Sequence, residues 1–270
     1  KIRSDGVEFR SHIDGSKHFM TPEDNMRVQR DIGADIVMAF DICPPSDGER
    51  GEIERAVELT TAWAHRCAEQ QLDPHQRLFG IVQGGLDHEL RSRSAEELLR
   101  LNLPGYAIGG LSVGESHEEM VRTTGFTAAL LPEDKPRYLM GVGMPMDIIR
   151  AVEAGIDMFD CVLPTRMARN GTVFTSRGRL VIRGGACKDD ASPMDENCDC
   201  PACRRYSRAY IRHLFNCGEI MGPRLATFHN LTFYVIHLRM VTLKFAKSCS
   251  IVLFVLYPQD IGKENLQSHA

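Results

Sequence analysis

Five short apolar runs alternate with amphipathic stretches over the first 163 residues of the chain. Between the first two runs, Ile53, Val57 and Ala64 fall on one face of a helix. Short apolar runs separated by helical patterns are typical of strands that alternate with helices, which predicts a parallel sheet with helices packed outside it. The predicted strands are Asp35–Phe40, Leu78–Gln83, Tyr106–Leu111, Tyr138–Val142 and Met158–Leu163.

Turn and capping residues predict two further elements before this repeat. Residues 7–18 alternate between apolar and polar positions around an Asp-Gly pair, which is typical of a hairpin. Thr21 precedes a proline and an acidic first turn, so we expect it to cap a helix that ends at Gly33.

The alternation of strands and helices stops after Thr165. Arg166–Gly171 is interpreted as a basic loop, and Thr172–Ile182 as a second hairpin. A cysteine-rich loop follows, and then the helical patterns Arg204–Cys217 and Leu225–Leu238.

Polar residues and glycines stand at the ends of the predicted strands. The carboxyl ends of parallel strands form the active-site face of a (β/α)8 barrel, but an open doubly wound sheet also binds ligands at this edge. The pattern alone leaves both folds open, because only five strands are evident. These strand-end positions include Asp41 and Cys43, Gln83, the segment Gly109–Glu115, and Asp160, whose carboxylate interrupts an apolar run.

Charge and hydropathy restrict the class of protein. The 32 basic and 36 acidic residues give a net charge of −4, so any contact with nucleic acid must be local. No apolar run approaches the roughly 20 residues that span a bilayer, and no signal peptide opens the chain. We therefore expect a cytoplasmic protein without a membrane segment, in which cysteines bind metal or are buried.

Three of the nine cysteines lie within six positions. Cys198, Cys200 and Cys203 can supply three thiolates, and His229 follows 26 residues later in a helical pattern. Zinc takes four sulfur or nitrogen ligands in a tetrahedron, so this spacing predicts one structural zinc ion. His213 and Cys217 are alternative fourth ligands, and a few buried thiols with a capping histidine are the metal-free interpretation.

Four motifs in one order resemble the tRNA-guanine transglycosylase family, also called queuine tRNA-ribosyltransferases. They extend from about Gly6 to about Tyr234, and the chain is most similar to the bacterial-type catalytic members. The motifs are Phe159–Arg166 (FDCVLPTR), Gly109–Glu115 (GGLSVGE), Phe79–Gly84 (FGIVQG) and the Cys-x-Cys-x₂-Cys…His spacing.

The resemblance implies a pentosyltransferase that exchanges guanine at the anticodon wobble position of tRNA for a 7-deazaguanine. It implies a (β/α)8 TIM barrel with a zinc-binding insertion near its C-terminal end. Asp160 would be the nucleophile that attacks the ribose, as a carboxylate does in retaining glycosidases. The incoming base would be bound by Asp41, Cys43, Gln83, Gly109, Gly110, Leu111 and Glu115, with Tyr106 and Met140 as its apolar faces.

The same resemblance implies the macromolecular partners. Arg166 and Arg169 would contact the anticodon loop, and the protein would form a homodimer or a heterodimer with a family member. Cys43 and Val113 match the bacterial-type members, which favours 7-aminomethyl-7-deazaguanine over queuine as the inserted base.

The chain also departs from the family pattern. The family's Asp-Ser-Gly-Gly-aromatic-Gln segment is not in the sequence, so we expect an N-terminally truncated chain with the early barrel strands missing. The apolar run Ser250–Tyr257 replaces an expected polar, helical continuation. The predicted domains are 1–183, a partial catalytic barrel; 184–238, a zinc-binding subdomain with closing helices; and 239–270, a divergent tail.

Two functions of other classes compete with the transglycosylase. A catalytically inactive tRNA-binding subunit of the same family would explain the absent upstream aspartate, but not the retention of Asp160, Asp41 and Gln83. A zinc-dependent hydrolase would need an open metal position near the strand ends. The sequence has no pair of histidines there.

Overall fold

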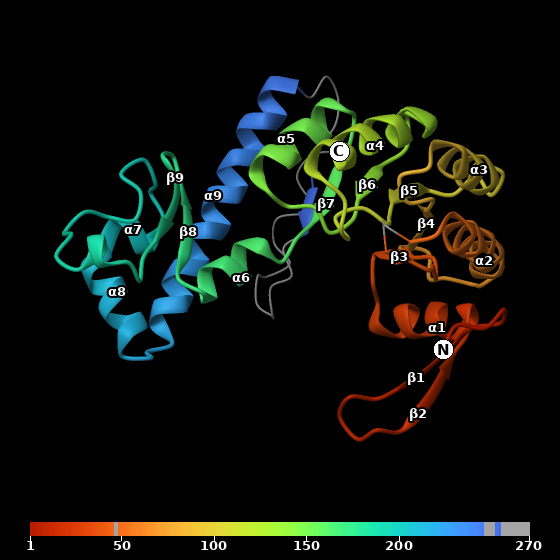
Figure 1. The fold of residues 1–270 in the computed structure, drawn as a ribbon, viewed down its shortest axis with the longest axis horizontal. Helices are drawn as coiled ribbons and strands as arrows, with labels where there is room; N and C mark the ends of the chain where they lie inside the picture. The colour runs from red at the N-terminus through yellow and green to blue at the C-terminus, as the bar shows by residue number, and fades with distance from the viewer. Residues whose placement is uncertain (46–47, 246–251, 255–270) are drawn as a thin grey trace. The chain divides into compact units, whose positions relative to one another are not determined.

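A computed structural model describes the backbone of residues 1–45, 48–245 and 252–254, and side chains as far as Ile236 (Figure 1). The chain separates into two compact units, of which the first contains Lys1–Phe159 and the second Asp160–Val235. Within the described residues, no helix is both long and apolar enough to cross a bilayer.

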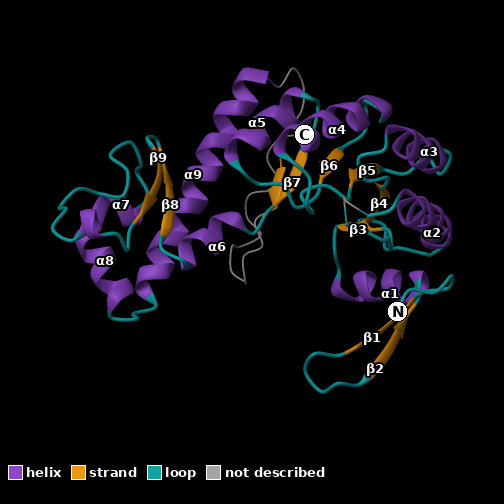
Figure 2. Ribbon diagram, in the orientation of Figure 1, coloured by secondary structure: helices purple, strands orange, loops and turns teal. Residues whose placement is uncertain are grey.

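The first unit contains five parallel strands that form a curled sheet, as part of a (β/α)8 barrel would (Figure 2). Neighbours along the chain are neighbours in the sheet, with Val37 opposite Leu78 and Leu139 opposite Phe159. A short segment, β10 (Val252–Phe254), lies beside the last strand. The five strands are β3 (Ile36–Met38), β4 (Arg77–Val82), β5 (Gly105–Ile108), β6 (Arg137–Leu139) and β7 (Met158–Asp160).

Helices follow the strands, and each helix packs against the next. The strands bury apolar side chains on both of their faces, and the helices bury theirs on the face turned to the strands. For this reason β5 is buried at every position. Trp63 is fully buried, and its ring stacks on Phe40 at 5.0 Å between centroids. These helices are α2 (Arg50–Ala68), α3 (His88–Leu99), α4 (His117–Leu130) and α5 (Pro145–Glu153).

The hairpin and first helix predicted from the sequence are confirmed. Strands β1 (Val7–Arg10) and β2 (Lys17–Met20) pair in antiparallel fashion. Helix α1 (Pro22–Ile32) begins at Thr21, whose hydroxyl accepts from the Asp24 amide while the Asp24 carboxylate accepts from the Thr21 amide.

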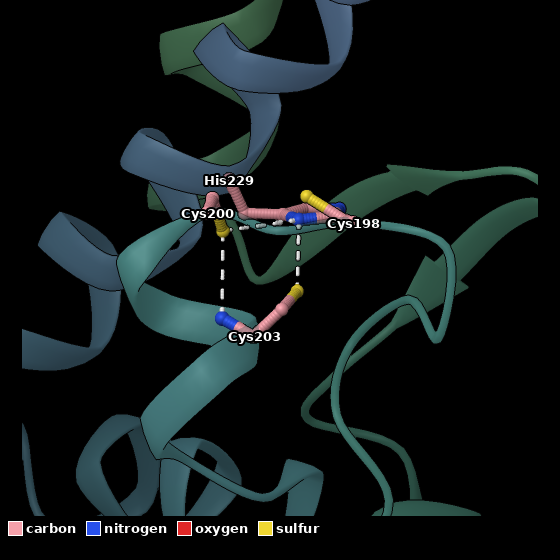
Figure 3. A group of neighbouring side chains, drawn as sticks. All are labelled: Cys198, Cys200, Cys203 and His229. Carbon is pink, nitrogen blue, oxygen red and sulfur yellow. Dashed lines mark hydrogen bonds between the residues drawn. The ribbon is translucent and has the colours of Figure 1, made fainter.

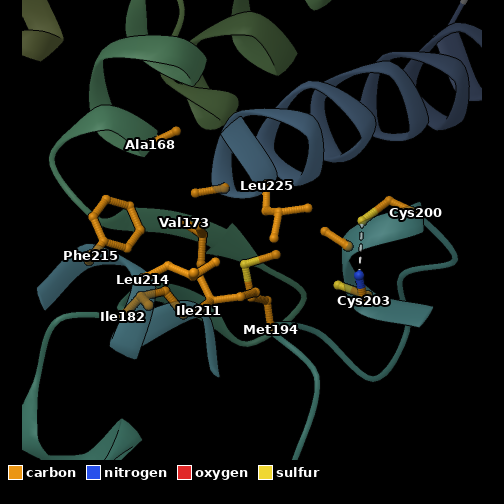
Figure 4. Packing of buried hydrophobic residues seen from close by; sticks show 12 residues of the cluster. Ala168, Val173, Ile182, Met194, Cys200, Cys203, Ile211, Leu214, Phe215 and Leu225 are labelled. Atoms are coloured by element: carbon orange, nitrogen blue, oxygen red, sulfur yellow. Dashed lines mark hydrogen bonds between the residues drawn. The ribbon is translucent and has the colours of Figure 1, made fainter. Parts of the chain in front are cut away.

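The second unit packs a hairpin against short helices around its own apolar core. Val173 lies near the start of the hairpin's first strand and Ile182 directly after its second strand. Both are fully buried with Met194 and Ile211 (Figure 4). The elements are α6 (Leu163–Arg169), β8 (Thr172–Thr175), β9 (Gly178–Val181), a 3-10 turn (Gly185–Cys187), α7 (Pro201–Arg205), α8 (Arg208–Asn216) and the part of α9 (Met221–Phe245) before residue 236.

Two predicted elements differ from the structure. The segment interpreted as a basic loop after Thr165 is largely helix α6, because Pro164 occupies a first-turn position where its missing N–H costs nothing. The predicted helix Arg204–Cys217 is broken, because Ser207 caps a new helix by accepting from the Tyr210 amide at 3.2 Å.

The predicted fold class is confirmed. The described residues form an α/β fold in which five parallel strands make up part of a barrel, as expected from the sequence. The predicted division into domains at residues 183 and 238 stays a prediction. Of the run Ser250–Tyr257, the structure describes Val252–Phe254 as a strand, and the other positions lie outside the described residues.

Candidate functional site

Two predicted base-binding residues meet at the carboxyl ends of β3 and β4. Asp41 follows β3, and Gln83 directly follows β4, its neighbour in the sheet. The side-chain amide nitrogen of Gln83 donates a hydrogen bond to the Asp41 carboxylate at 2.7 Å. The parallel topology therefore brings together two residues that are 42 positions apart in the sequence.

The carbonyl oxygen of the Gln83 side chain, Oε1, is buried and has no hydrogen-bond partner among the described residues. The Gln83 residue is only 1% exposed. A buried acceptor left unpaired costs on the order of 1–3 kcal/mol, so natural proteins seldom keep one without a partner. Oε1 is therefore a suitable acceptor for an N–H group of a bound ligand.

The Asp41 carboxylate is partly desolvated. Burial raises its pKa above the ordinary value, and the hydrogen bond from Gln83 opposes that rise. An acid in this state binds N–H donors strongly when it is ionised, because little water competes for its oxygens.

Gly109 and Gly110 leave room for the Gln83 amide. A Cβ atom on Gly109 would lie 2.7 Å from Gln83 Nε2, and one on Gly110 would lie 2.3 Å from Oε1. Gly110 also has φ +66°, in the left-handed region that favours glycine. Cys43 lies in the same neighbourhood, and its thiol pKa is raised by burial and by the Asp41 charge.

The loop after β5 is held by Glu115. Its carboxylate accepts from the backbone amides of Ser112 and Val113, the latter at 3.0 Å. Ser112 has φ +61°, an uncommon conformation for a residue with a side chain. Leu111 lies in the same loop and is 4% exposed. Glu115 thus stabilises a strained backbone conformation directly beyond Gly110.

The two predicted apolar faces have different surroundings. Tyr106 is 1% exposed, and its hydroxyl accepts from the Leu103 amide at 3.1 Å, so its ring belongs to the core and offers no free face to a base. The structure does not bring Tyr106 into the Asp41–Gln83 group. Met140 directly follows β6 and is half-buried, and its backbone amide donates to Ile108 at 3.2 Å.

The predicted nucleophile and RNA-binding residues lie at the start of the second unit. Asp160 is the last residue of β7 and is half-buried. Arg166 and Arg169 are exposed in the last turn of α6, and their spacing of three residues places them on one face of that helix.

One buried cation was missed by the sequence analysis. Arg91, on α3, is 0% exposed, and its guanidinium donates to backbone carbonyls beside Gln83 and Gly110. The missed signal is its spacing, because Arg91 falls at helical intervals from the buried residues Ser94 and Leu98.

The predicted metal ligands converge in the second unit (Figure 3). The ligand atoms of Cys198, Cys200, Cys203 and His229 all lie within 4.8 Å of one another. His229 Nδ1 is 3.3 Å from the Cys203 sulfur and 3.8 Å from the Cys200 sulfur. Three sulfurs and one imidazole nitrogen suit a tetrahedral zinc ion with no open position.

The surroundings of this cluster prepare it for a metal. The far ring nitrogen of His229, Nε2, lies 2.7 Å from the Phe174 carbonyl, which leaves Nδ1 facing the sulfurs. The hydrogen bond between the two thiols lowers the pKa of Cys200 and raises that of Cys203, so this pair favours one thiolate beside the imidazole.

The alternative fourth ligands form a separate pair. The Cys217 sulfur lies 3.5 Å from His213 Nε2, at the exposed end of α8. Neither residue belongs to the four-residue group. The expectation of His229 as the fourth member is therefore supported by geometry.

Comparisons with known proteins point to one family. A family model described as queuine tRNA-ribosyltransferase matches residues 1–243. A queuine tRNA-ribosyltransferase of Caldanaerobacter subterraneus is 57% identical over 237 residues, which cover 87% of this chain and 63% of that protein. Those of Halothermothrix orenii and Ruminiclostridium cellulolyticum are 54% and 56% identical, over 86% and 87% of this chain and 62% and 63% of theirs. The chain thus spans slightly less than two thirds of these curated relatives.

The cysteine–histidine cluster generates a first prediction. We expect the purified protein to bind about one zinc ion per chain, and His229→Ala or Cys200→Ser to lose it, because either change opens the ligand set. Atomic absorption of the dialysed proteins measures the loss, and thermal unfolding should show a lower midpoint. His213→Ala is the matched control, and loss of zinc from that variant but not from His229→Ala would contradict the assignment.

Asp41 generates a second prediction. Because burial raises its pKa, the wild type loses stability as the pH rises from the unfolded value of about 3.9 through the folded value. Asparagine keeps an acceptor for Gln83 without that loss. We therefore expect Asp41→Asn to have the higher free energy of unfolding at pH 7, measured by urea titration, with the gain shrinking toward about pH 4. An equal gain in Asp35→Asn, an exposed acid at the start of the same strand, would show that Asp41 is not the cause.

Proposed function

This chain belongs to the queuine tRNA-ribosyltransferase family, and from that premise we propose that the protein exchanges guanine at the wobble position of tRNA for a 7-deazaguanine. The observation that carries the proposal is the Asp41–Gln83 pair, with its desolvated carboxylate and a buried carbonyl that no described residue pairs with. Both groups stand at the edge where parallel strands present their ligands.

The hydrogen-bond donors and acceptors of Asp41 and Gln83 determine which base the site can recognise. Guanine and 7-deazaguanines share an edge that carries N–H donors beside a carbonyl oxygen. The Asp41 carboxylate accepts from N–H groups, while the Gln83 amide has one acceptor free and one further N–H to donate to a carbonyl. An adenine, with an amino group where guanine has its carbonyl, would leave that amide hydrogen unpaired.

Asp160 is proposed as the nucleophile. One carboxylate oxygen attacks the anomeric carbon of the ribose while the bond from that carbon to guanine N9 breaks, and the guanine takes a proton as it leaves. N9 of the incoming base then loses a proton, attacks the same carbon and releases the carboxylate. Two displacements at one carbon retain its configuration, and no phosphate bond is broken.

Glu115 and Cys43 complete the proposed pocket. Glu115 holds the peptides after Gly110, so it can turn a peptide or carry a proton when one base replaces another. The presence of Cys43 and Val113 favours 7-aminomethyl-7-deazaguanine over queuine as the incoming base. Met140 is kept as an apolar face, whereas Tyr106 is not.

The RNA is proposed to bind through the second unit. Residues 160–235 contain 11 arginines and lysines against 7 acids, although the whole chain is acidic. Arg166 and Arg169, exposed on α6, supply contacts for phosphates and bases of the anticodon loop. Because its proposed substrate is tRNA, we propose that the protein works in the cytoplasm. A second copy or a related chain is its proposed protein partner.

The zinc-binding residues are assigned a structural role. Cys198, Cys200, Cys203 and His229 would hold the ion and leave no ligand position for water or substrate. The ion would therefore stabilise the second unit rather than take part in the exchange.

The nucleophile assignment gives a third prediction. Asp160→Asn should form no covalent RNA adduct on denaturing gels and should lower guanine exchange by on the order of 10³-fold or more, because an amide is a poor nucleophile. Filter binding of tRNA should persist in this variant. Asp189→Asn, an exposed acid of the same unit, should behave as wild type.

Two outcomes would contradict the proposal. An adduct in Asp160→Asn would place the nucleophile elsewhere. Binding of tRNA by the wild type without any exchange of labelled guanine would instead indicate a non-catalytic tRNA-binding subunit.

A further inference from the structure

Arg91 is a fully buried cation whose described hydrogen bonds all go to backbone carbonyls. Its Nε donates to Gly85 at 2.8 Å, and its two terminal nitrogens donate to Val82 at 3.2 Å and to Gly110 at 3.4 Å. No salt bridge to a carboxylate is found for it among the described residues. The guanidinium is thus in direct contact with backbone dipoles and not with a carboxylate of the described residues.

This arrangement is costly. Burial lowers the pKa of Arg91 to about 10, and the charge of Glu115 opposes that change. A buried charge without a paired ion destabilises a fold unless hydrogen bonds compensate for the lost water. An apolar side chain at this position of α3 would avoid that cost, but it would leave the carbonyls of Gly85 and Gly110 without this donor.

The three carbonyls lie where two neighbouring strands lead into the loops of the proposed base pocket. Val82 ends β4, Gly85 lies in the loop that follows it, and Gly110 lies in the loop after β5. The fork of the guanidinium therefore joins two loops that are otherwise separate in the sequence, and it does so next to the Gln83 amide.

Helix α3 holds Gln83 at a second point. The Ser94 hydroxyl, one turn beyond Arg91, accepts from the Gln83 backbone amide at 3.1 Å. The loop also lies directly against the helix, because a Cβ on Gly84 would be 2.7 Å from the Arg91 backbone nitrogen. The backbone of Gln83 is thus fixed on both sides by one helix.

From these contacts we infer that Arg91 is a positioning residue for base recognition, which sets the Gln83 amide and the Gly110 loop at the spacing that a guanine-like base requires. The inference rests on the proposed function. Arg91 touches neither base nor RNA in this role, and it acts through the carbonyls of Val82, Gly85 and Gly110.

The test compares Arg91→Lys and Arg91→Met with Arg93→Met, an exposed control on the same helix that pairs with Glu54 and Glu58. We expect both Arg91 variants to raise KM for guanine by roughly ten- to a hundred-fold, since charge-assisted hydrogen bonds are lost, and to leave KM for tRNA within about two-fold. Arg91→Lys should be the milder change, because an ammonium still donates hydrogen bonds, although it cannot reach all three carbonyls.

Two further readouts separate positioning from general damage. Guanidinium, at a concentration that does not unfold the protein, should partly restore the guanine KM of Arg91→Ala. Hydrogen exchange should become faster at the amides of residues 84–86 and 110–113 in Arg91→Met, but not in the control.

Each result decides the role of Arg91. An unchanged guanine KM, equal rises in both KM values, or unchanged exchange at the two loops would overturn the inference. If the wild type exchanges no guanine, the proposed function fails separately, and hydrogen exchange at the two loops still supports or overturns the positioning role.

Discussion

The hydrogen bond between Gln83 and Asp41 is the interaction on which the proposed site depends. It exists because β3 and β4 are parallel neighbours, so the residues after them leave the sheet at one edge. The same contact orients the Gln83 amide, and the buried carbonyl of that amide has no partner in the part of the chain that the structure describes. A desolvated acid next to an unpaired acceptor is poorly suited to an empty pocket and well suited to one that receives N–H groups.

The second unit has a comparable buried hydrogen-bonded residue beside the cysteine–histidine cluster. Asn230 is fully buried next to His229, and it accepts from the Phe174 amide while it donates to the carbonyls of Pro164 and Thr172. Since Pro164 lies in α6, these bonds connect the helix that bears the cluster's histidine to the helix that presents Arg166 and Arg169. A structural zinc ion would thereby order the proposed RNA-binding surface without taking part in the chemistry.

Much of this architecture could be predicted from the sequence. Buried parallel strands are apolar on both faces, so their runs stand out, and the Thr21 and Ser116 capping boxes mark helix starts. The cysteine–histidine cluster was predictable because its three cysteines lie within six positions. The burial of Tyr106 could not be predicted, since an aromatic residue in a strand has the same sequence signal whether its ring faces a ligand or the core.

The remaining features depend on tertiary contacts. The first-turn proline is the local signal for α6, and tertiary contacts complete that helix, whereas the role of Arg91 follows only from the carbonyls that the fold brings around it. A crystal structure of the protein with guanine would test the central claim most directly. We predict N–H groups of the base on the Asp41 carboxylate and a hydrogen bond to the Gln83 amide, each at about 2.7–3.2 Å. Guanine bound elsewhere, with the carbonyl of Gln83 still unpaired, would contradict the account.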